Sequence, residues 1–149
     1  DSVIADYTWM TFLGAQVPQR AADFFAVIRS ARDAGLDFLR ERFVARQPVM
    51  GYEVDDHVRA ILHAAGYGAN FVHRTGHNIG TVVHGNGANL DNLETHDDRL
   101  LLPNTCCSME PGIYLPDMGV RTEVNVLLLD GAIEVTGLPA QTEIQPLLA

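Results

Sequence analysis

The chain has 149 residues, of which 47% are hydrophobic and 19% are charged, so it can form one domain with a sizeable core rather than a disordered chain. Its formal net charge of −9 argues against nucleic acid or an anionic membrane as the main partner, because phosphate binding needs a basic surface. A cationic substrate or a divalent metal ion is compatible with this charge.

Residues 2–14, at the start of the chain, are rich in β-branched and aromatic side chains up to Gly14, which predicts a strand. Residues 19–45 then place apolar side chains at three-four spacing, which predicts a long amphipathic helix after Pro18. Residues 51–68 repeat this spacing and predict a second helix, with Gly66 as its stop signal.

The second half of the chain has a different character from residue 69 onward. Glycines interrupt residues 70–90, which predicts short strands and loops, and strands are predicted within 105–114, 118–130 and 132–139. The order of one strand, two helices and then several strands predicts the α+β class, with a mainly antiparallel sheet flanked by two helices. We expect a single domain over residues 1–149.

The two cysteines, Cys106 and Cys107, are adjacent in the sequence. Neighbouring cysteines rarely form a disulfide, so they indicate a reducing compartment, and we expect two small buried side chains. The sequence shows no signal-peptide pattern and no apolar run of bilayer length, so we expect a cytoplasmic protein.

Two glutamates raise the main question about function. The strands before and after Pro116–Asp117 are expected to form a hairpin that places Glu110 opposite Glu123. Like charges at directly opposed positions are destabilising. The pair can share a proton, bind a cation, or pair with Arg121, which lies two residues from Glu123 on the same strand face.

Three histidines, His73, His77 and His84, lie close together in the glycine-rich segment. They do not form the helical zinc motif His-Glu-x-x-His, because no glutamate follows either of the first two. A metal site at the two glutamates would need further ligands, which Asp6 and His77 could provide, and such a set suits Mn, Co, Fe or Zn. The remaining histidines are expected to be structural or solvated: His57, His63 and His96.

The motifs His73-Arg-Thr-Gly-His-Asn-Ile-Gly80 and Glu110-Pro-Gly-Ile-Tyr114, with Asp6-Tyr-Thr-Trp9 before them, resemble those of the pita-bread metallopeptidases. This family includes Xaa-Pro aminopeptidases, prolidases and methionine aminopeptidases, and the resemblance is closest to the Xaa-Pro branch. It covers essentially the whole chain in the right order. It implies a pita-bread fold and a dinuclear metal-dependent aminopeptidase or dipeptidase, in which a metal-activated water cleaves the bond between an N-terminal residue and proline.

The resemblance also implies roles for particular residues. The family binds two divalent ions, here Mn, Co, Zn or Fe, through two Asp, one His and two Glu. Four positions match these ligands: Asp6, His77, Glu110 and Glu123. His84 matches a histidine that stabilises the transition state, and Glu110 also matches the residue that shuttles a proton. His73 matches a histidine near the substrate, and Arg121 an arginine that supports the site.

The sequence departs from the family pattern in two places. The family's first Asp ligand lies farther upstream of the second than the five residues that precede Asp6, and Asp1 would face the opposite side of a strand. Trp9 stands where many relatives carry Arg. The resemblance therefore implies that the chain is the C-terminal portion of a pita-bread catalytic domain, with incomplete metal binding and weak or no activity alone.

The expected partners are a peptide with proline in its second position and either a second copy or the remaining N-terminal part of the domain. Two alternatives stay open. The chain could belong to a pita-bread binding module without peptidase activity, or to a metal-free amidinohydrolase like creatinase; relatives of both kinds usually lack several metal ligands, whereas this sequence matches four.

Overall fold

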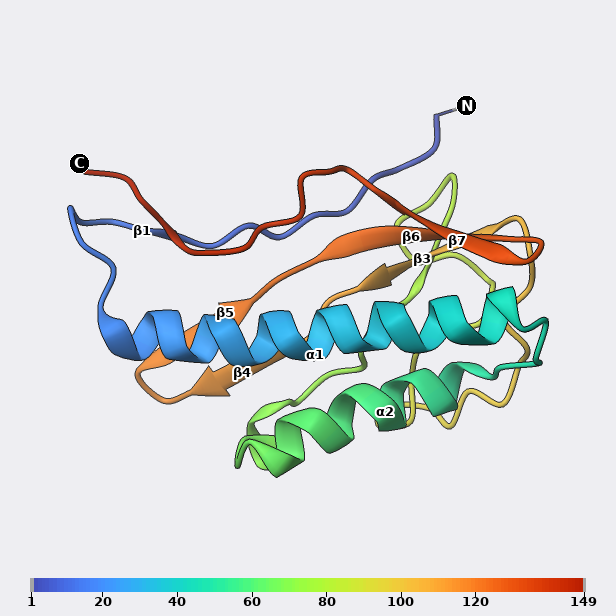
Figure 1. The fold of residues 1–149 in the computed structure, drawn as a ribbon, viewed down its shortest axis with the longest axis horizontal. Coiled ribbons are helices and arrows are strands. Elements are labelled where there is room, and N and C mark those ends of the chain that lie inside the picture. The colour runs from blue at the N-terminus through green and yellow to red at the C-terminus, as the bar shows by residue number, and fades with distance from the viewer. Residues whose placement is uncertain (1, 149) are drawn as a thin grey trace.

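Residues 2–148 are described by the computed structural model, in which two long helices lie along one side of a twisted sheet (Figure 1). None of these helices is long and apolar enough to span a bilayer. In chain order, the elements are β1 (Thr11–Phe12), α1 (Gln19–Val44), α2 (Gly51–Ala64), the 3-10 helix η1 (Gly68–Asn70), β2 (Asn78–Ile79), β3 (Thr105–Met109), β4 (Gly112–Leu115), β5 (Met118–Arg121), β6 (Val124–Leu129), β7 (Ala132–Thr136) and β8 (Gln145–Pro146).

Both helices were expected from the apolar spacing, and both are present. Helix α1 follows Pro18, whose fixed φ suits the start of a helix. Helix α2 ends at Ala64, directly before the predicted stop at Gly66, which adopts φ +88° and turns the chain. At its start the carboxylate of Glu53 accepts a 2.8 Å hydrogen bond from the backbone N–H of Met50, which satisfies a donor at the helix end.

The main sheet has the strand order β2-β3-β6-β7 and is antiparallel throughout. Strands β4 and β5 form a separate ladder at the far end of the same long hairpin, which turns at Pro116–Asp117 as predicted. Met109 pairs with Val124 and Gly112 pairs with Arg121, so the two ladders share one register on either side of a short interruption. The α+β class and the mainly antiparallel sheet are confirmed.

The opening segment (residues 2–12) differs from its prediction. Only Thr11–Phe12 forms a ladder, and it pairs in parallel with β8, a strand that was not predicted. Upstream, side-chain amides take the place of a partner strand: Asn125 bonds both backbone groups of Asp6 at 3.0 and 2.6 Å. Gln141 bonds both backbone groups of Met10 at 2.7 and 2.6 Å. Upstream of Thr11 the segment is therefore extended, as its residue types indicate, without being part of a sheet.

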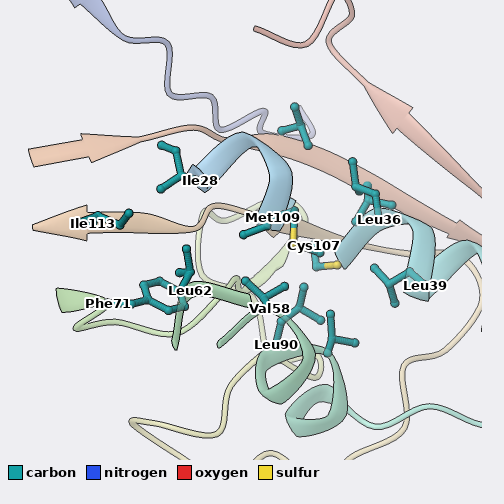
Figure 2. Close-up of a cluster of buried hydrophobic side chains, with 14 of the residues drawn as sticks. Ile28, Leu36, Leu39, Val58, Leu62, Phe71, Leu90, Cys107, Met109 and Ile113 are labelled. Carbon is teal, nitrogen blue, oxygen red and sulfur yellow. The ribbon is translucent and has the colours of Figure 1, made fainter. Parts of the chain in front are cut away.

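The core lies between the helices and the sheet. Figure 2 shows side chains from α1, including Ile28 and Leu39, meeting Val58 of α2 and Met109 of β3. Gly35 of α1 allows this approach, because a Cβ there would lie 2.8 Å from Val58 and 2.9 Å from Met109. This packing fixes the end of β3, directly before Glu110, against both helices.

Candidate functional site

The predicted site residues come together in a pocket of about 290 Å³. They arrive from the opening segment, from the loop around β2 and from the two sides of the hairpin interruption. The lining residues are Asp6, His73, Arg74, His77, His84, Glu94, Glu110, Arg121 and Glu123. A larger groove of about 400 Å³ lies near the hairpin turn, but its charged lining residues are Arg20 and Asp117, which form an exposed ion pair.

The interruption in the hairpin holds the two glutamates. Glu110 directly follows β3 and Glu123 directly precedes β6, at opposed positions of the shared register. The N–H of Glu110 donates to Thr75 O at 2.8 Å, and the N–H of Glu123 donates to Thr8 O at 3.2 Å. Each glutamate is thus held by a different neighbouring segment, and the ladder opens where the carboxylates meet.

His77 lies at the centre of the carboxylates. Its Nε2 atom is 3.3 Å from Glu110 Oε1 and 3.7 Å from Asp6 Oδ2. Its Nδ1 atom lies 3.3 Å from the carbonyl oxygen of Asn78, an acceptor that favours the tautomer with the proton on Nδ1. That tautomer leaves the lone pair of Nε2 directed at the carboxylates, as a metal-binding imidazole requires.

Glu123 has one oxygen without a protein partner. Thr8 Oγ1 donates a 2.7 Å hydrogen bond to Oε2, whereas Oε1 is buried and accepts no hydrogen bond within residues 2–148. Burial raises the pKa of Glu123, the Thr8 hydrogen bond lowers it, and the nearby charges of Glu110 and Asp6 raise it further. A cation beside Oε1 would remove this unfavourable arrangement.

Glu110 has partners for both oxygens. Ser108 Oγ donates to Oε1 at 3.0 Å, and Arg121 Nη1 lies 3.5 Å from Oε2. Burial raises the pKa of Glu110, while the Ser108 hydrogen bond and the charge of Arg121 act in the opposite direction. Arg121 therefore pairs across the hairpin with Glu110, and not with Glu123 on its own strand as we had considered, because its Nε is held by Thr8 Oγ1 at 3.1 Å.

The other two histidines of the cluster border the pocket differently. The exposed ring of His84 lies edge-to-face on His77, with ring centroids 4.3 Å apart. His73 is fixed by Tyr114, whose hydroxyl is 2.9 Å from Nε2, and by the carbonyl oxygen of Arg74 at Nδ1. Burial lowers the pKa of His73, so its neutral form is favoured.

The residues expected to be structural lie elsewhere. His57 stacks on Phe38, His96 contacts Tyr52, and none of His57, His63 and His96 lines the pocket. Both cysteines are free; Cys107 is buried and Cys106 partly so. Asp1, which we had rejected as a ligand, lies outside the described residues.

Three polar residues that support the site were not predicted. Asn125 holds the backbone of Asp6, and Ser108 contacts both His77 and Glu110. Arg32 of α1 is 2% exposed and donates to Thr122 Oγ1, beside Glu123, and to Gln141 O, both at 2.9 Å. For Asn125 and Ser108 the sequence signal was a single polar residue within an apolar stretch, because a buried polar group needs hydrogen-bond partners. Arg32 carries no such signal, because Ser30 and Asp33 lie beside it.

The donor set suits a divalent metal ion. Asp6, His77 and Glu123 each offer a ligand atom, and these three atoms lie within 4.8 Å of one another. Glu110 Oε1 adjoins the same imidazole nitrogen. Carboxylates with one imidazole are hard or borderline ligands, and the buried Oε1 of Glu123 lacks any other partner among the described residues. The residues present therefore fit a metal centre.

Comparison with known sequences adds independent information. The model of metallopeptidase family M24 matches residues 1–130. The Xaa-Pro dipeptidase of Lactobacillus delbrueckii subsp. lactis is 34% identical over 126 residues, which cover 83% of this chain and 32% of that protein. The probable dipeptidase PepE of Mycobacterium tuberculosis H37Rv is 34% identical over 127 residues, which cover 84% of this chain and 31% of that protein.

Solved structures agree with the sequence matches. A dipeptidase from Pyrococcus horikoshii OT3 superposes with a TM-score of 0.81 at 27% identity, covering 97% of this chain and 38% of that one. An X-Pro aminopeptidase from Thermotoga maritima MSB8 gives 0.80 at 28% identity, with the same coverage. The fold is thus the pita-bread fold of prolidases and aminopeptidases, and the chain spans about a third of the length of these relatives.

Proposed function

We propose, from the premise that the chain belongs to metallopeptidase family M24, that it carries most of the metal centre of an exopeptidase that cleaves the bond between an N-terminal residue and proline. The observation that carries this proposal is the meeting of Asp6, His77 and Glu123 around the unpartnered Oε1 of Glu123. The similarity to an Xaa-Pro dipeptidase and to an X-Pro aminopeptidase supports the substrate class.

In this proposal the ligands are Asp6, His77, Glu110 and Glu123, which would hold two ions of Mn, Co, Zn or Fe. When bound, such ions act as Lewis acids and make a nucleophilic water available near neutral pH. Of the protein groups, the exposed imidazole of His84 donates a hydrogen bond to the developing oxyanion. Glu110, whose carboxylate borders the pocket, carries a proton to the leaving nitrogen. His73 and Arg121 orient the substrate and the carboxylates.

The opening segment supports the further proposal that the site is completed by polypeptide outside these residues. Along one edge of the segment, the backbone groups of every second residue form hydrogen bonds with the rest of the chain. The partners, in order from Ile4 to Met10, are Gly80, Asn125, Glu123 and Gln141. The backbone groups of Val3, Ala5, Tyr7 and Trp9 make no hydrogen bond within residues 2–148, and these side chains are exposed. An extended segment with one open edge is a ready template for another strand.

We propose that a strand from the remaining part of a pita-bread domain pairs with this edge and supplies the fifth ligand, an Asp. The share of the relatives' length that the chain covers supports this assignment. From the family resemblance we also propose that the protein is cytoplasmic and that two copies of it form a homodimer.

Calorimetric titration of Mn²⁺ tests the proposal, with the 149-residue chain compared with a version extended upstream. We expect two tightly bound ions in the extended protein and weaker, incomplete binding in the chain alone, because one carboxylate ligand is missing. Hydrolysis of an Xaa-Pro dipeptide should follow the same order. Equally tight binding of two ions by both proteins would show that no ligand from outside these residues is needed. Absence of binding in both would rule out the metal centre.

A further inference from the structure

Ser108 is a buried polar residue to which the proposed mechanism gives no role. It lies on β3 between two apolar core residues, and its side chain is 0% exposed. Its Oγ atom accepts a 2.9 Å hydrogen bond from the backbone N–H of His77 and donates a 3.0 Å hydrogen bond to Glu110 Oε1. One hydroxyl thus contacts both the segment that carries the imidazole and the carboxylate that faces it.

The direction of these two hydrogen bonds is fixed by chemistry. A backbone N–H can only donate, so the Ser108 oxygen must act as the acceptor toward His77. The single hydroxyl proton is then free for Glu110 Oε1, which must present a lone pair and not a proton at that position. The same oxygen lies 3.3 Å from His77 Nε2. In a buried setting such a chain of hydrogen bonds is strengthened by the low dielectric.

The backbone around Ser108 reinforces this arrangement. Its N–H donates to the carbonyl oxygen of His77 at 2.9 Å, so Ser108 and His77 are joined by two hydrogen bonds. The contact requires a glycine next to His77, because a Cβ on Gly76 would lie 2.0 Å from the carbonyl oxygen of Ser108. Across the sheet, Ser108 pairs with Asn125, the residue that holds the backbone of Asp6.

We propose that Ser108 is a positioning residue that sets the placement of Glu110 relative to His77 in the metal centre. The inference rests on the proposed function, since His77 and Glu110 act as ligands only there. Its hydroxyl holds Oε1 next to Nε2 and leaves Oε2 to Arg121, so that Glu110 is oriented before any ion binds. A residue that merely filled the core at this position would need no hydroxyl.

The test is a Mn²⁺ titration of the 149-residue chain, followed by paramagnetic broadening of the amide signals of residues 76–78. Ser108→Ala should weaken the binding about ten- to a hundredfold, the usual effect of removing a hydrogen bond that orients a metal ligand. Ser108→Thr keeps the hydroxyl and should restore most of the affinity. Ser108→Cys keeps the size with a weaker donor and should fall between the two, which preserves the test if the added methyl of Thr disturbs the fold.

Two controls separate the possible outcomes. Thr105→Val removes a hydroxyl from the same strand, one that bonds only the carbonyl oxygen of Leu102, and should leave the affinity unchanged. His77→Ala should abolish the localised broadening. Unchanged affinity in Ser108→Ala, together with loss in His77→Ala, would overturn the role of Ser108 alone. Unchanged broadening in His77→Ala would overturn the metal centre, and the inference with it.

Discussion

The two glutamates of the hairpin occupy matching positions but face differently built surroundings. Beside Glu110 lies the histidine loop (residues 73–79), which is fixed from several sides. The N–H of Thr75 donates a 2.8 Å hydrogen bond to the buried carboxylate of Asp55, and Gly76 forms an antiparallel β-bridge with Leu90. Beside Glu123 lies the opening segment, which is bonded along one edge only. One side of the pocket is therefore complete within this chain, whereas the other has an open edge.

The carboxylates reflect this difference. Both oxygens of Glu110 have protein partners, Ser108 and Arg121, so its orientation is settled by the chain itself. Glu123 is bonded by Thr8 at one oxygen and has a buried, unpartnered second oxygen. The comparison indicates that the chain itself fixes the orientation of Glu110, while the surroundings of Glu123 favour a bound cation.

The largest expected effect is on catalysis at Glu123. In the version extended upstream, Glu123→Gln should reduce Xaa-Pro hydrolysis by roughly a thousandfold or more, because metal assistance supplies several kcal/mol of transition-state stabilisation. Circular dichroism should show an intact fold. Glu134→Gln changes an exposed glutamate on β7 and serves as the control. A Glu123→Gln protein that still hydrolyses the dipeptide would refute the ligand role.

A smaller effect is expected from the support of the opening segment. Asn125→Ala removes both hydrogen bonds to the backbone of Asp6 and should lower the free energy of unfolding by about 2 kcal/mol. Mn²⁺ affinity should fall as well, because Asp6 loses its fixed position. Chemical denaturation and metal titration measure the two effects, with the exposed Asn86→Ala as the control. Loss of stability without loss of affinity would show that Asp6 is positioned by other contacts.

The smallest effect is a pH dependence in the metal-free chain. Burial raises the pKa of Glu123 above 4.5, so the folded chain binds this proton more tightly than the unfolded chain. Stability is therefore lost as pH rises from about 4.5 through the folded value, and Glu123→Gln should escape that loss. Melting temperatures measured in EDTA should thus favour the variant above this range and converge below it.

The matching variant at Glu110 sharpens the comparison. Burial also raises the pKa of Glu110, so Glu110→Gln should gain stability over the same range of pH. The gain should be smaller than at Glu123, because the substitution removes the charge that Arg121 faces. An equal or larger gain in stability for Glu110→Gln would contradict the view that the surroundings of Glu110 compensate its charge better than those of Glu123 do.

The sequence predicted much of this arrangement because local patterns carry it. Apolar spacing located both helices, and the turn at Pro116–Asp117 set the register that opposes Glu110 and Glu123. Every residue named as a site candidate lines the pocket. The resemblance to the family was confirmed by the match to residues 1–130.

Other features depended on contacts between distant segments. The β-favouring residues 2–14 form little ladder because their partners are the side chains of Asn125 and Gln141, more than a hundred residues away. The ion pair between Arg121 and Glu110 likewise depends on the pairing of the two hairpin strands, and not on spacing along the strand of Arg121.

The sequence by itself thus determined both helices, the hairpin register and the set of residues that line the pocket, since these depend on periodicity, turn chemistry and motif. Only the tertiary structure decided which oxygen of each glutamate is satisfied, which polar residue supports which ligand, and which edge of the opening segment is open. The physical reason is that a buried polar atom forms its hydrogen bond with whichever group the fold brings within reach. The distance between two groups in space cannot be read from their separation along the chain.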